Sequence, residues 1–178
     1  SISPGNYRLK ADIGFGGVRT LNLNNGTNYA TAVEFTDTDN LWNATGIDKY
    51  AYDAHFGTEA THEFYFTNFG RNSYDNAGAQ MVSYVHYSNN YVNAFWNGNY
   101  MTYGDGDGVD FTPLTSLDIV GHEITHAVTQ FSAGLVYANE SGALNESFSD
   151  CFGVTIDFFK NPTTANFLEG DQVNVGGI

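Results

Sequence analysis

The chain has 178 residues, of which 42% are hydrophobic and 15% are charged, so it is long and apolar enough to form a folded globular domain. Its formal net charge is −14, from 20 acidic and 6 basic residues, which argues against nucleic acid and anionic membranes as partners, since both require Lys and Arg. No apolar run approaches the about 20 residues that a transmembrane helix needs.

Short strands are predicted within the first 40 residues. Runs of strand-forming residues, broken by turns, occur at Tyr7–Ile13, Val18–Leu23 and Thr31–Phe35. The triplet Asn24-Asn25-Gly26, between the second and third runs, is typical of a hairpin turn. The chain is therefore expected to begin with a β-rich portion.

One helix and three strands are predicted in the middle of the chain. Residues 44–68 contain no Pro, and small and apolar side chains recur there at helical spacing. Strands are predicted at Gln80–Tyr87, Asn93–Trp96 and Tyr100–Tyr103, and Asn97-Gly98 is expected to form the turn between the last two.

Two helices are predicted in the last third. Apolar residues recur between Leu117 and Phe131 at the spacing of one helix face, and Gly134 is expected to follow the end of that helix. The segment Thr115-Ser116-Leu117-Asp118 has the form of a capping box at its start. A second helix is predicted from Ser141 to Lys160, with Asn161-Pro162 ending it.

The first of these helices contains the sequence His122-Glu123-Ile124-Thr125-His126. Side chains four residues apart share one helix face, so both imidazoles can bind one ion, and Glu123 borders the same face. Neutral imidazole suits zinc, and a carboxylate beside a zinc-bound water can accept its proton. The alternative is a pair of surface histidines beside a solvated Glu. A closed structural zinc site is disfavoured because Cys151 is the single cysteine.

A third zinc ligand is available on the following helix. Glu146 and Asp150 are four residues apart and share one face. Glu146 would complete a set of two His and one Glu, and Asp150 would then hold the other N–H of a ligand histidine. The alternative is a solvated acidic face. By contrast, His86 lies in a predicted strand, and we expect it to be a hydrogen-bonded structural histidine.

These residues and their surroundings resemble the thermolysin family of zinc metallopeptidases over about residues 45–160. The segments that carry the resemblance are His122–Thr129, Ala133–Tyr137, Asn139–Glu146 and Ser149-Asp150, preceded by Val85–Ser88, Asn93–Gly98 and Tyr103–Gly108. The fold implied is α+β: a β-rich N-terminal lobe with one helix and the substrate-edge strand, residues 1–113, followed by a two-helix zinc-binding segment, residues 114–178.

The resemblance implies a zinc-dependent endopeptidase that acts through a metal-activated water. The zinc ligands implied are His122, His126 and Glu146, with Glu123 as the general base. The residues implied to support them are Asp150 and Asn145, as partners of the two histidines, and Tyr137, as a stabiliser of the developing oxyanion.

The resemblance also implies how a peptide or protein substrate binds. Asn93 and the backbone of Ala94 would hold the substrate chain, partly as a strand added to the edge. Phe111, Leu114 and Ile119 match positions that line the pocket for the residue after the scissile bond. The specificity implied is therefore a bulky hydrophobic residue at that position.

A structural calcium ion is the second metal expected. The excess acid is compatible with a solvated surface or with carboxylates gathered for hard cations. The resemblance implies calcium ligands at Asp118 and Asp157, and later ones at Asn166 and the Leu168 carbonyl. We expect one calcium ion here, because fuller double sites in the family carry more acidic residues.

Family members have a second, mainly helical domain that supplies a histidine and an arginine to the cleft. We find no counterpart of either residue, so we expect the C-terminal domain to be absent from this chain. We expect it to form a second chain of an enzyme that has been nicked into two. A deliberate fragment and an isolated first domain remain as alternatives. The alternative function is a catalytically silent zinc-binding fragment or interaction module. The resemblance implies a secreted, extracellular protein.

Overall fold

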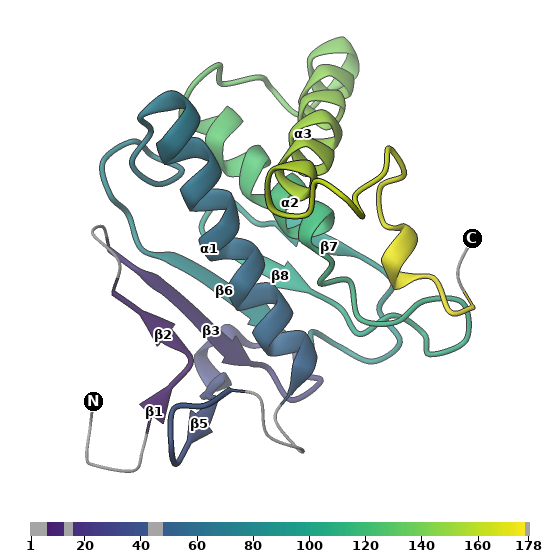
Figure 1. Ribbon diagram of the computed structural model, residues 1–178. Coiled ribbons are helices and arrows are strands. Elements are labelled where there is room, and N and C mark those ends of the chain that lie inside the picture. The colour runs from purple at the N-terminus through teal and green to yellow at the C-terminus, as the bar shows by residue number, and fades with distance from the viewer. Residues whose placement is uncertain (1–6, 13–15, 43–47, 177–178) are drawn as a thin grey trace.

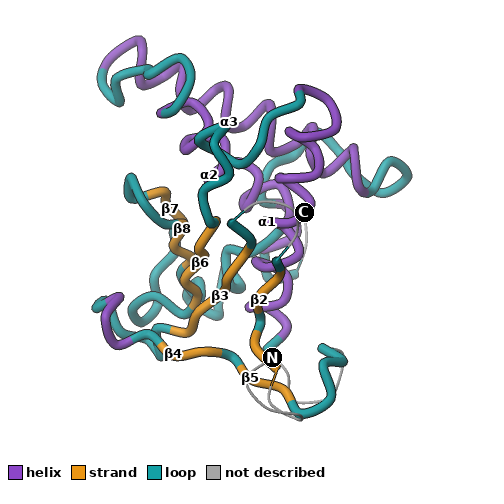
Figure 2. The backbone as a smooth tube through the Cα atoms, turned by 90° about the vertical axis from the view of Figure 1, so that its left-hand side faces the viewer, coloured by secondary structure: helices purple, strands orange, loops and turns teal. Residues whose placement is uncertain are grey.

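The computed structural model describes residues 7–12, 16–42 and 48–176. Ile13, at the end of one expected strand, and residues 44–47, at the start of the expected helix, lie outside the described residues. Helices cover one side of a twisted sheet (Figure 1), and the view turned by 90° shows the strands on one side and the helices on the other (Figure 2).

The main sheet combines parallel and antiparallel pairs. Its order is β2-β3-β6-β8-β7, with β4 also paired to β3. The bounds of its strands are β2 Lys10–Ala11, β3 Val18–Asn22, β4 Val33–Glu34, β6 Met81–Val85, β7 Ala94–Trp96 and β8 Met101–Tyr103. β3 and β8 both run parallel to β6, and the remaining pairs are antiparallel. A separate pair joins β1 (Tyr7–Arg8) to β5 (Thr36–Asp37).

The β6–β8 region matches the predicted strands closely, and the N-terminal region does so less well. The turn at Asn97-Gly98 joins β7 to β8 as predicted, with Asn97 N donating to Tyr100 O at 3.1 Å. The expected strand Tyr7–Ile13 is instead divided into β1 and β2, which belong to different sheets. A 3-10 helix, η1 (Tyr29–Thr31), lengthens the connection that leads from β3 to β4.

Helix α1 (Lys49–Phe69) packs against the sheet through a buried face made mainly of small residues. The carboxylate of Asp48 caps it by accepting hydrogen bonds from the backbone N–H groups of Tyr50 and Ala51. It ends at Gly70, whose φ of +62° is the left-handed conformation that favours glycine. The carboxylate of Asp48 also forms a hydrogen bond with His86, whose Nε2 lies 2.5 Å from Asp48 Oδ2. The other ring nitrogen, Nδ1, lies 2.7 Å from Asp105 Oδ1. These bonds confirm His86 as a structural histidine.

Helices α2 (Leu117–Gln130) and α3 (Asn139–Lys160) pack tightly against each other. A Cβ atom at Gly153 of α3 would come within 2.5 Å of Asp118 O, so only glycine permits this approach of the two backbones. The predicted capping box is wrong: Ser116 is the N-cap but makes no side-chain cap hydrogen bond. Asp118 Oδ2 instead accepts from Gly170 N at 2.6 Å, which ties the segment after α3 to the start of α2.

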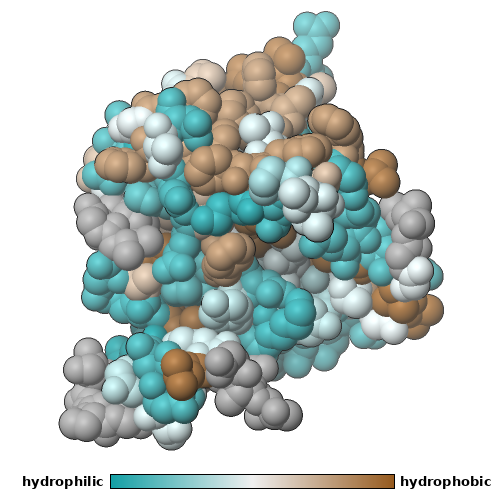
Figure 3. Space-filling view, viewed as in Figure 1, coloured by the Kyte–Doolittle hydropathy of each residue, from teal (hydrophilic) through white to brown (hydrophobic). Residues whose placement is uncertain are grey.

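The segment after α3 contains a second 3-10 helix, η2 (Asp171–Val173), and bonds to the segment before α2, with Thr112 N donating to Val173 O at 2.8 Å. Apolar side chains gather over the helical part of the surface (Figure 3). Leu144 and Phe148 of α3 are about half exposed there. No helix in the described part of the chain is both long enough and apolar enough to cross a membrane.

Candidate metal centre

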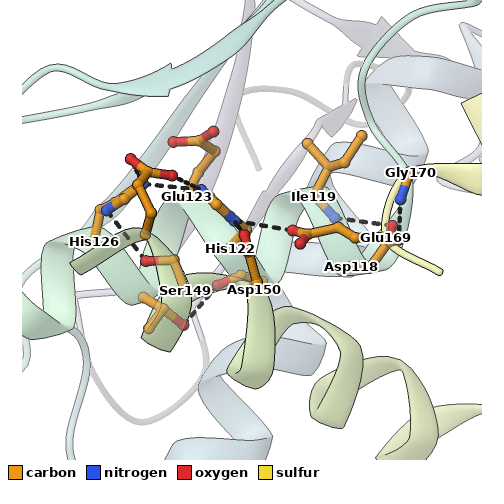
Figure 4. Close-up of polar contacts among 12 residues, drawn as sticks. Asp118, Ile119, His122, Glu123, His126, Ser149, Asp150, Glu169 and Gly170 are labelled. Atoms are coloured by element: carbon orange, nitrogen blue, oxygen red, sulfur yellow. Dashed lines mark hydrogen bonds and ion pairs between the residues drawn. The ribbon is translucent and has the colours of Figure 1, made fainter. Parts of the chain in front are cut away.

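Three side chains from α2 and α3 lie close together, and Figure 4 shows the two that come from α2, His122 and His126. His122 and His126 lie one turn apart on α2, and their Nε2 atoms are 2.9 Å apart. Glu146 reaches them from α3, with one oxygen 3.3 Å from His122 Nε2 and the other 3.4 Å from His126 Nε2. The three residues named as zinc ligands from the resemblance thus lie close enough together to share one ion.

The side chains that contact the Nδ1 atoms of the two histidines determine which ring nitrogens carry protons. His126 Nδ1 lies 2.8 Å from Asn145 Oδ1, and the amide of Asn145 is oriented by its own bond to Leu135 O. His122 Nδ1 lies 2.9 Å from carboxylate oxygens of both Asp150 and Glu169. Protons on the two Nδ1 atoms would face these acceptors, which leaves both Nε2 lone pairs on the side of Glu146.

This donor set fits zinc. Two imidazole lone pairs and a carboxylate facing one another repel unless a cation lies between them. Ligand atoms of a tetrahedral zinc ion lie about 3.3–3.6 Å apart, given bond lengths of about 2.0–2.2 Å. The three observed separations, 2.9, 3.3 and 3.4 Å, are close to that range. Three protein ligands leave the fourth position for water or substrate, as in catalytic zinc sites.

Glu123 lies beside this centre and is 6% exposed. Its Oε2 accepts a hydrogen bond from the backbone N–H of Trp96 at 2.8 Å. Burial raises the pKa of Glu123 to about 7, although His122 and the Trp96 N–H oppose the shift. A buried carboxylate with a pKa near neutrality is suited to accepting and releasing a proton.

Tyr137 lies in the loop between α2 and α3 and is 67% exposed. Its hydroxyl donates a hydrogen bond to Glu146 Oε1, and that bond raises the pKa of Tyr137 to about 12. The phenol therefore keeps its proton and remains a hydrogen-bond donor at the rim of the centre.

An open cleft runs from the metal centre along β7. Its lining includes Asn93, Ala94, Glu123 and Tyr137, so the structure brings these predicted residues together. Among the described strands, β7 lies at the edge of the sheet and pairs with β8 alone. Asn93 O and Asn97 N bond to the β8 side, so the backbone groups of Ala94 and Trp96 point away from the sheet. This edge can receive an added strand.

A second pocket also adjoins His122 and Glu123. It is lined by the three residues predicted for the pocket after the scissile bond, Phe111, Leu114 and Ile119. Val173 and Glu169, which the sequence reading did not assign to it, complete its wall. Burial raises the pKa of Glu169, and its hydrogen bond with His122 opposes the shift.

The four predicted calcium ligands belong to α2, to α3 and to the segment that follows α3. Asp118 and Asp157 are both buried, and burial together with the charge of Asp118 raises the pKa of Asp157. Asn166 Oδ1 accepts from Leu168 N at 2.6 Å. Among the described residues, both groups of three His or acidic side chains that are close enough to share an ion contain His122. The calcium site stays a prediction.

Three contacts of the centre were missed by the sequence reading. They are the carboxylate of Glu169, the hydroxyl of Ser149, which lies 3.1 Å from His126 Nδ1, and the backbone N–H of Trp96. Glu169 lies in an irregular segment with no periodicity to place it. The Trp96 contact uses the backbone, which leaves no mark in the residue type.

Comparison with known proteins gives a consistent result. A family model described as "Thermolysin metallopeptidase, catalytic domain" matches residues 1–130, and one described as "Thermolysin metallopeptidase, alpha-helical domain" matches residues 133–177. Bacillolysin of Bacillus cereus is 53% identical over 128 residues, covering 71% of this chain and 22% of the relative. Thermolysin of Bacillus sp. strain EA1 is 46% identical over 145 residues, covering 81% and 26% respectively.

A solved structure agrees with these relatives. The precursor of protealysin, a metalloproteinase from Serratia proteamaculans, superposes with a TM-score of 0.82 at 35% identity, covering 95% of this chain and 52% of that chain. The chain therefore spans about a quarter of the length of the two sequence relatives and about half of this structure.

One expectation about the fold is wrong. The mainly helical C-terminal domain is not absent, because its family model matches residues 133–177, so part of that domain is present. α3, which carries Glu146, belongs to that part. The helix from the helical domain nevertheless packs directly on α2, as the contact of Gly153 with Asp118 O shows.

Proposed function

The chain belongs to the thermolysin family of metallopeptidases, and we propose that it carries the zinc-binding and proton-transfer groups of an endopeptidase that hydrolyses peptide bonds with water. The observation that carries this proposal is the convergence of three lone-pair donors, His122, His126 and Glu146, beside the buried carboxylate of Glu123. The activity belongs to the whole protein, of which this chain supplies one part.

The metal ligands of the proposal are His122, His126 and Glu146. A bound zinc ion would lower the pKa of its water towards about 7 and polarise the carbonyl of the peptide bond. Asn145 would hold the Nδ1–H group of His126, and Asp150, 2.9 Å from Nδ1 of His122, would do the same there, so that both Nε2 atoms would be available to the ion.

Glu123 is the proposed general base. Its carboxylate accepts the proton from the attacking water and passes it to the leaving amine, so no covalent acyl intermediate is needed. The Trp96 N–H holds one of its oxygens in place. The hydroxyl of Tyr137, kept protonated by its bond to Glu146, is the proposed donor to the developing oxyanion.

The substrate is proposed to be a peptide or protein chain held along β7. The outward backbone groups of Ala94 offer one donor and one acceptor, and the side chain of Asn93 lines the same cleft. The side chain after the scissile bond would enter the pocket of Phe111, Leu114 and Ile119, whose apolar walls favour a bulky hydrophobic residue.

Three further features are proposed for the whole enzyme. One structural calcium ion would bind near Asp118 and Asp157, with Asn166 and the Leu168 carbonyl as additional ligands. The rest of the helical domain, in the same chain or as a second chain, would form the other wall of the cleft. The protein would act outside the cell, in keeping with the resemblance to secreted proteases.

Glu123→Gln tests the proposal in the whole enzyme. The amide keeps the size of the side chain but cannot take a proton, so we expect cleavage of a peptide to fall by about 10²–10⁴-fold while zinc content is unchanged. Glu140→Gln is the matched control, because Glu140 is exposed in the first turn of α3 and lines neither pocket. Chelator should abolish wild-type cleavage, and added zinc should restore it.

Two outcomes would contradict this proposal. Full activity of Glu123→Gln would remove Glu123 from the role of base. Stoichiometric zinc in a wild-type enzyme that cleaves no peptide would instead support a silent zinc-binding module.

A further inference from the structure

The pocket beside His122 is built from two segments that bond to each other. Thr112 N donates to Val173 O at 2.8 Å, and Val175 N donates to Asp110 O at 2.9 Å. Phe111 and Asn174 form an isolated antiparallel bridge between them. Gly170 N is fixed by Asp118 Oδ2 at 2.6 Å. The wall that carries residues 169–174 is therefore held against the wall that carries residues 110–114.

Most of this wall is apolar, but one residue in it is a carboxylate. Glu169 precedes Gly170, where an added Cβ atom would lie 3.6 Å from Ile119 Cδ1 and 3.9 Å from Val173 Cγ2. Glu169 lines the pocket together with Leu114 and Ile119. Its side chain is 24% exposed, and Figure 4 shows its carboxylate directed towards His122 beside Asp150.

No cation of this chain neutralises that carboxylate. All six Lys and Arg residues lie within the described ranges, and each bonds to a group away from the pocket. Their partners are Glu34 for Arg8 and Arg19, Asp12 for Lys10, Asp53 for Lys49, Tyr74 O for Arg71 and Glu63 for Lys160. The nearest titratable bases are His122 and His126, whose imidazoles are neutral when they ligate a metal.

We propose that this pocket also accepts a basic side chain, lysine or arginine, as the residue after the scissile bond, and that Glu169 determines this specificity. The aliphatic stem would lie on Leu114, Ile119 and Val173, while the cation would lie beside Glu169. A long cationic side chain has this division into an apolar stem and a charged end. The inference rests on the proposed function and extends its expected preference for bulky hydrophobic residues.

The test compares two peptides that differ only in the residue after the scissile bond, lysine in one and norleucine in the other. Norleucine has the same four-carbon stem without the ammonium group. We expect Glu169→Gln in the whole enzyme to lower the lysine-to-norleucine ratio of kcat/KM by about 10-fold. Any loss of zinc or of folded protein affects both peptides equally, so it cancels in the ratio. Glu140→Gln should leave the ratio unchanged.

Two further measurements make the outcome decisive. The lysine advantage should shrink as salt rises, because it is electrostatic. Binding of two dipeptide hydroxamates, one with lysine and one with norleucine, is measured on the zinc-loaded protein and requires no hydrolysis. If neither peptide is cleaved, the proposed function fails, and the hydroxamate ratio still decides this inference. A ratio that stays the same in Glu169→Gln, or a wild-type protein that neither cleaves the lysine peptide nor binds its hydroxamate, would overturn it.

Discussion

His86 and His122 have similar surroundings and different roles. Both side chains are about 15% exposed, and each lies within 3 Å of two carboxylates: Asp48 and Asp105 for His86, Asp150 and Glu169 for His122. Burial alone would lower both pKa values, but the hydrogen bonds and charges of the carboxylates raise each to about 9. Burial and acidic neighbours therefore do not distinguish a structural histidine from a metal ligand.

The difference is in what surrounds the second ring nitrogen, because Nε2 of His122 faces a second imidazole, His126, as well as the carboxylate of Glu146. In His86 both nitrogens face carboxylates, so both carry protons and neither lone pair is free for a metal. In His122 both carboxylates meet Nδ1, and Nε2 faces His126 and Glu146 instead. A histidine becomes a candidate metal ligand when hydrogen-bond acceptors hold one ring nitrogen and the other ring nitrogen faces further side chains that can bind the same metal ion.

The largest expected effect follows from removing one donor at the metal centre. His126→Ala leaves two of the three ligands, so we expect zinc affinity to fall by more than about 100-fold, beyond what the loss of an outer partner causes. Competition with a chromogenic chelator measures this affinity. His86→Ala is the control and should change zinc affinity by less than about 3-fold. If the two variants lost the same amount of zinc affinity, the assignment of His126 as a ligand and of His86 as a structural histidine would be wrong.

The second effect concerns stability. His86→Ala leaves the carboxylates of Asp48 and Asp105 without their shared partner. Because Asp48 is also the N-cap of α1, the start of that helix is no longer held by His86. We expect a loss of about 3 kcal/mol in the free energy of unfolding. Denaturant unfolding of the metal-free protein measures it. A loss below about 1 kcal/mol would mean that the pair contributes no more than an exposed surface ion pair.

The smallest effect is a dependence of stability on pH. Folding raises the pKa of His86 from its ordinary 6.5 to about 9. The stabilisation is complete below pH 6.5 and is lost as the pH rises through about 9, because the folded form holds a proton that the unfolded form has released. We expect the stability difference between wild type and His86→Gln to shrink by about 2 kcal/mol across this window. Chelator keeps zinc out of both measurements. A difference independent of pH would contradict the raised pKa.

Much of the candidate site could be predicted because helical spacing is rigid. Residues four apart on a helix share a face whatever surrounds them, so the approach of His122 to His126 follows from their positions. The convergence with Glu146 also follows, since two amphipathic helices joined by a short loop pack against each other.

The remaining features depend on contacts that sequence spacing does not determine. Parallel pairing of β3 with β6 joins segments about sixty residues apart, and no local signal specifies that partner. The division of the first expected strand into β1 and β2 likewise depends on two different partner strands. Glu169 reaches His122 from an irregular segment that is fixed by a backbone bond from Gly170 to Asp118.

The bond between Trp96 N–H and Glu123 limits how this protein can vary in evolution. It joins the edge strand to a helix 27 residues further along the chain. A one-residue insertion in β7 would turn the Trp96 N–H to the opposite side of the strand, since successive backbone groups alternate in direction. The carboxylate would then lose its donor without any change in a catalytic residue. Natural insertions are therefore expected at Gly98-Asn99, between the paired residues Asn97 and Tyr100, and excluded from β7 itself.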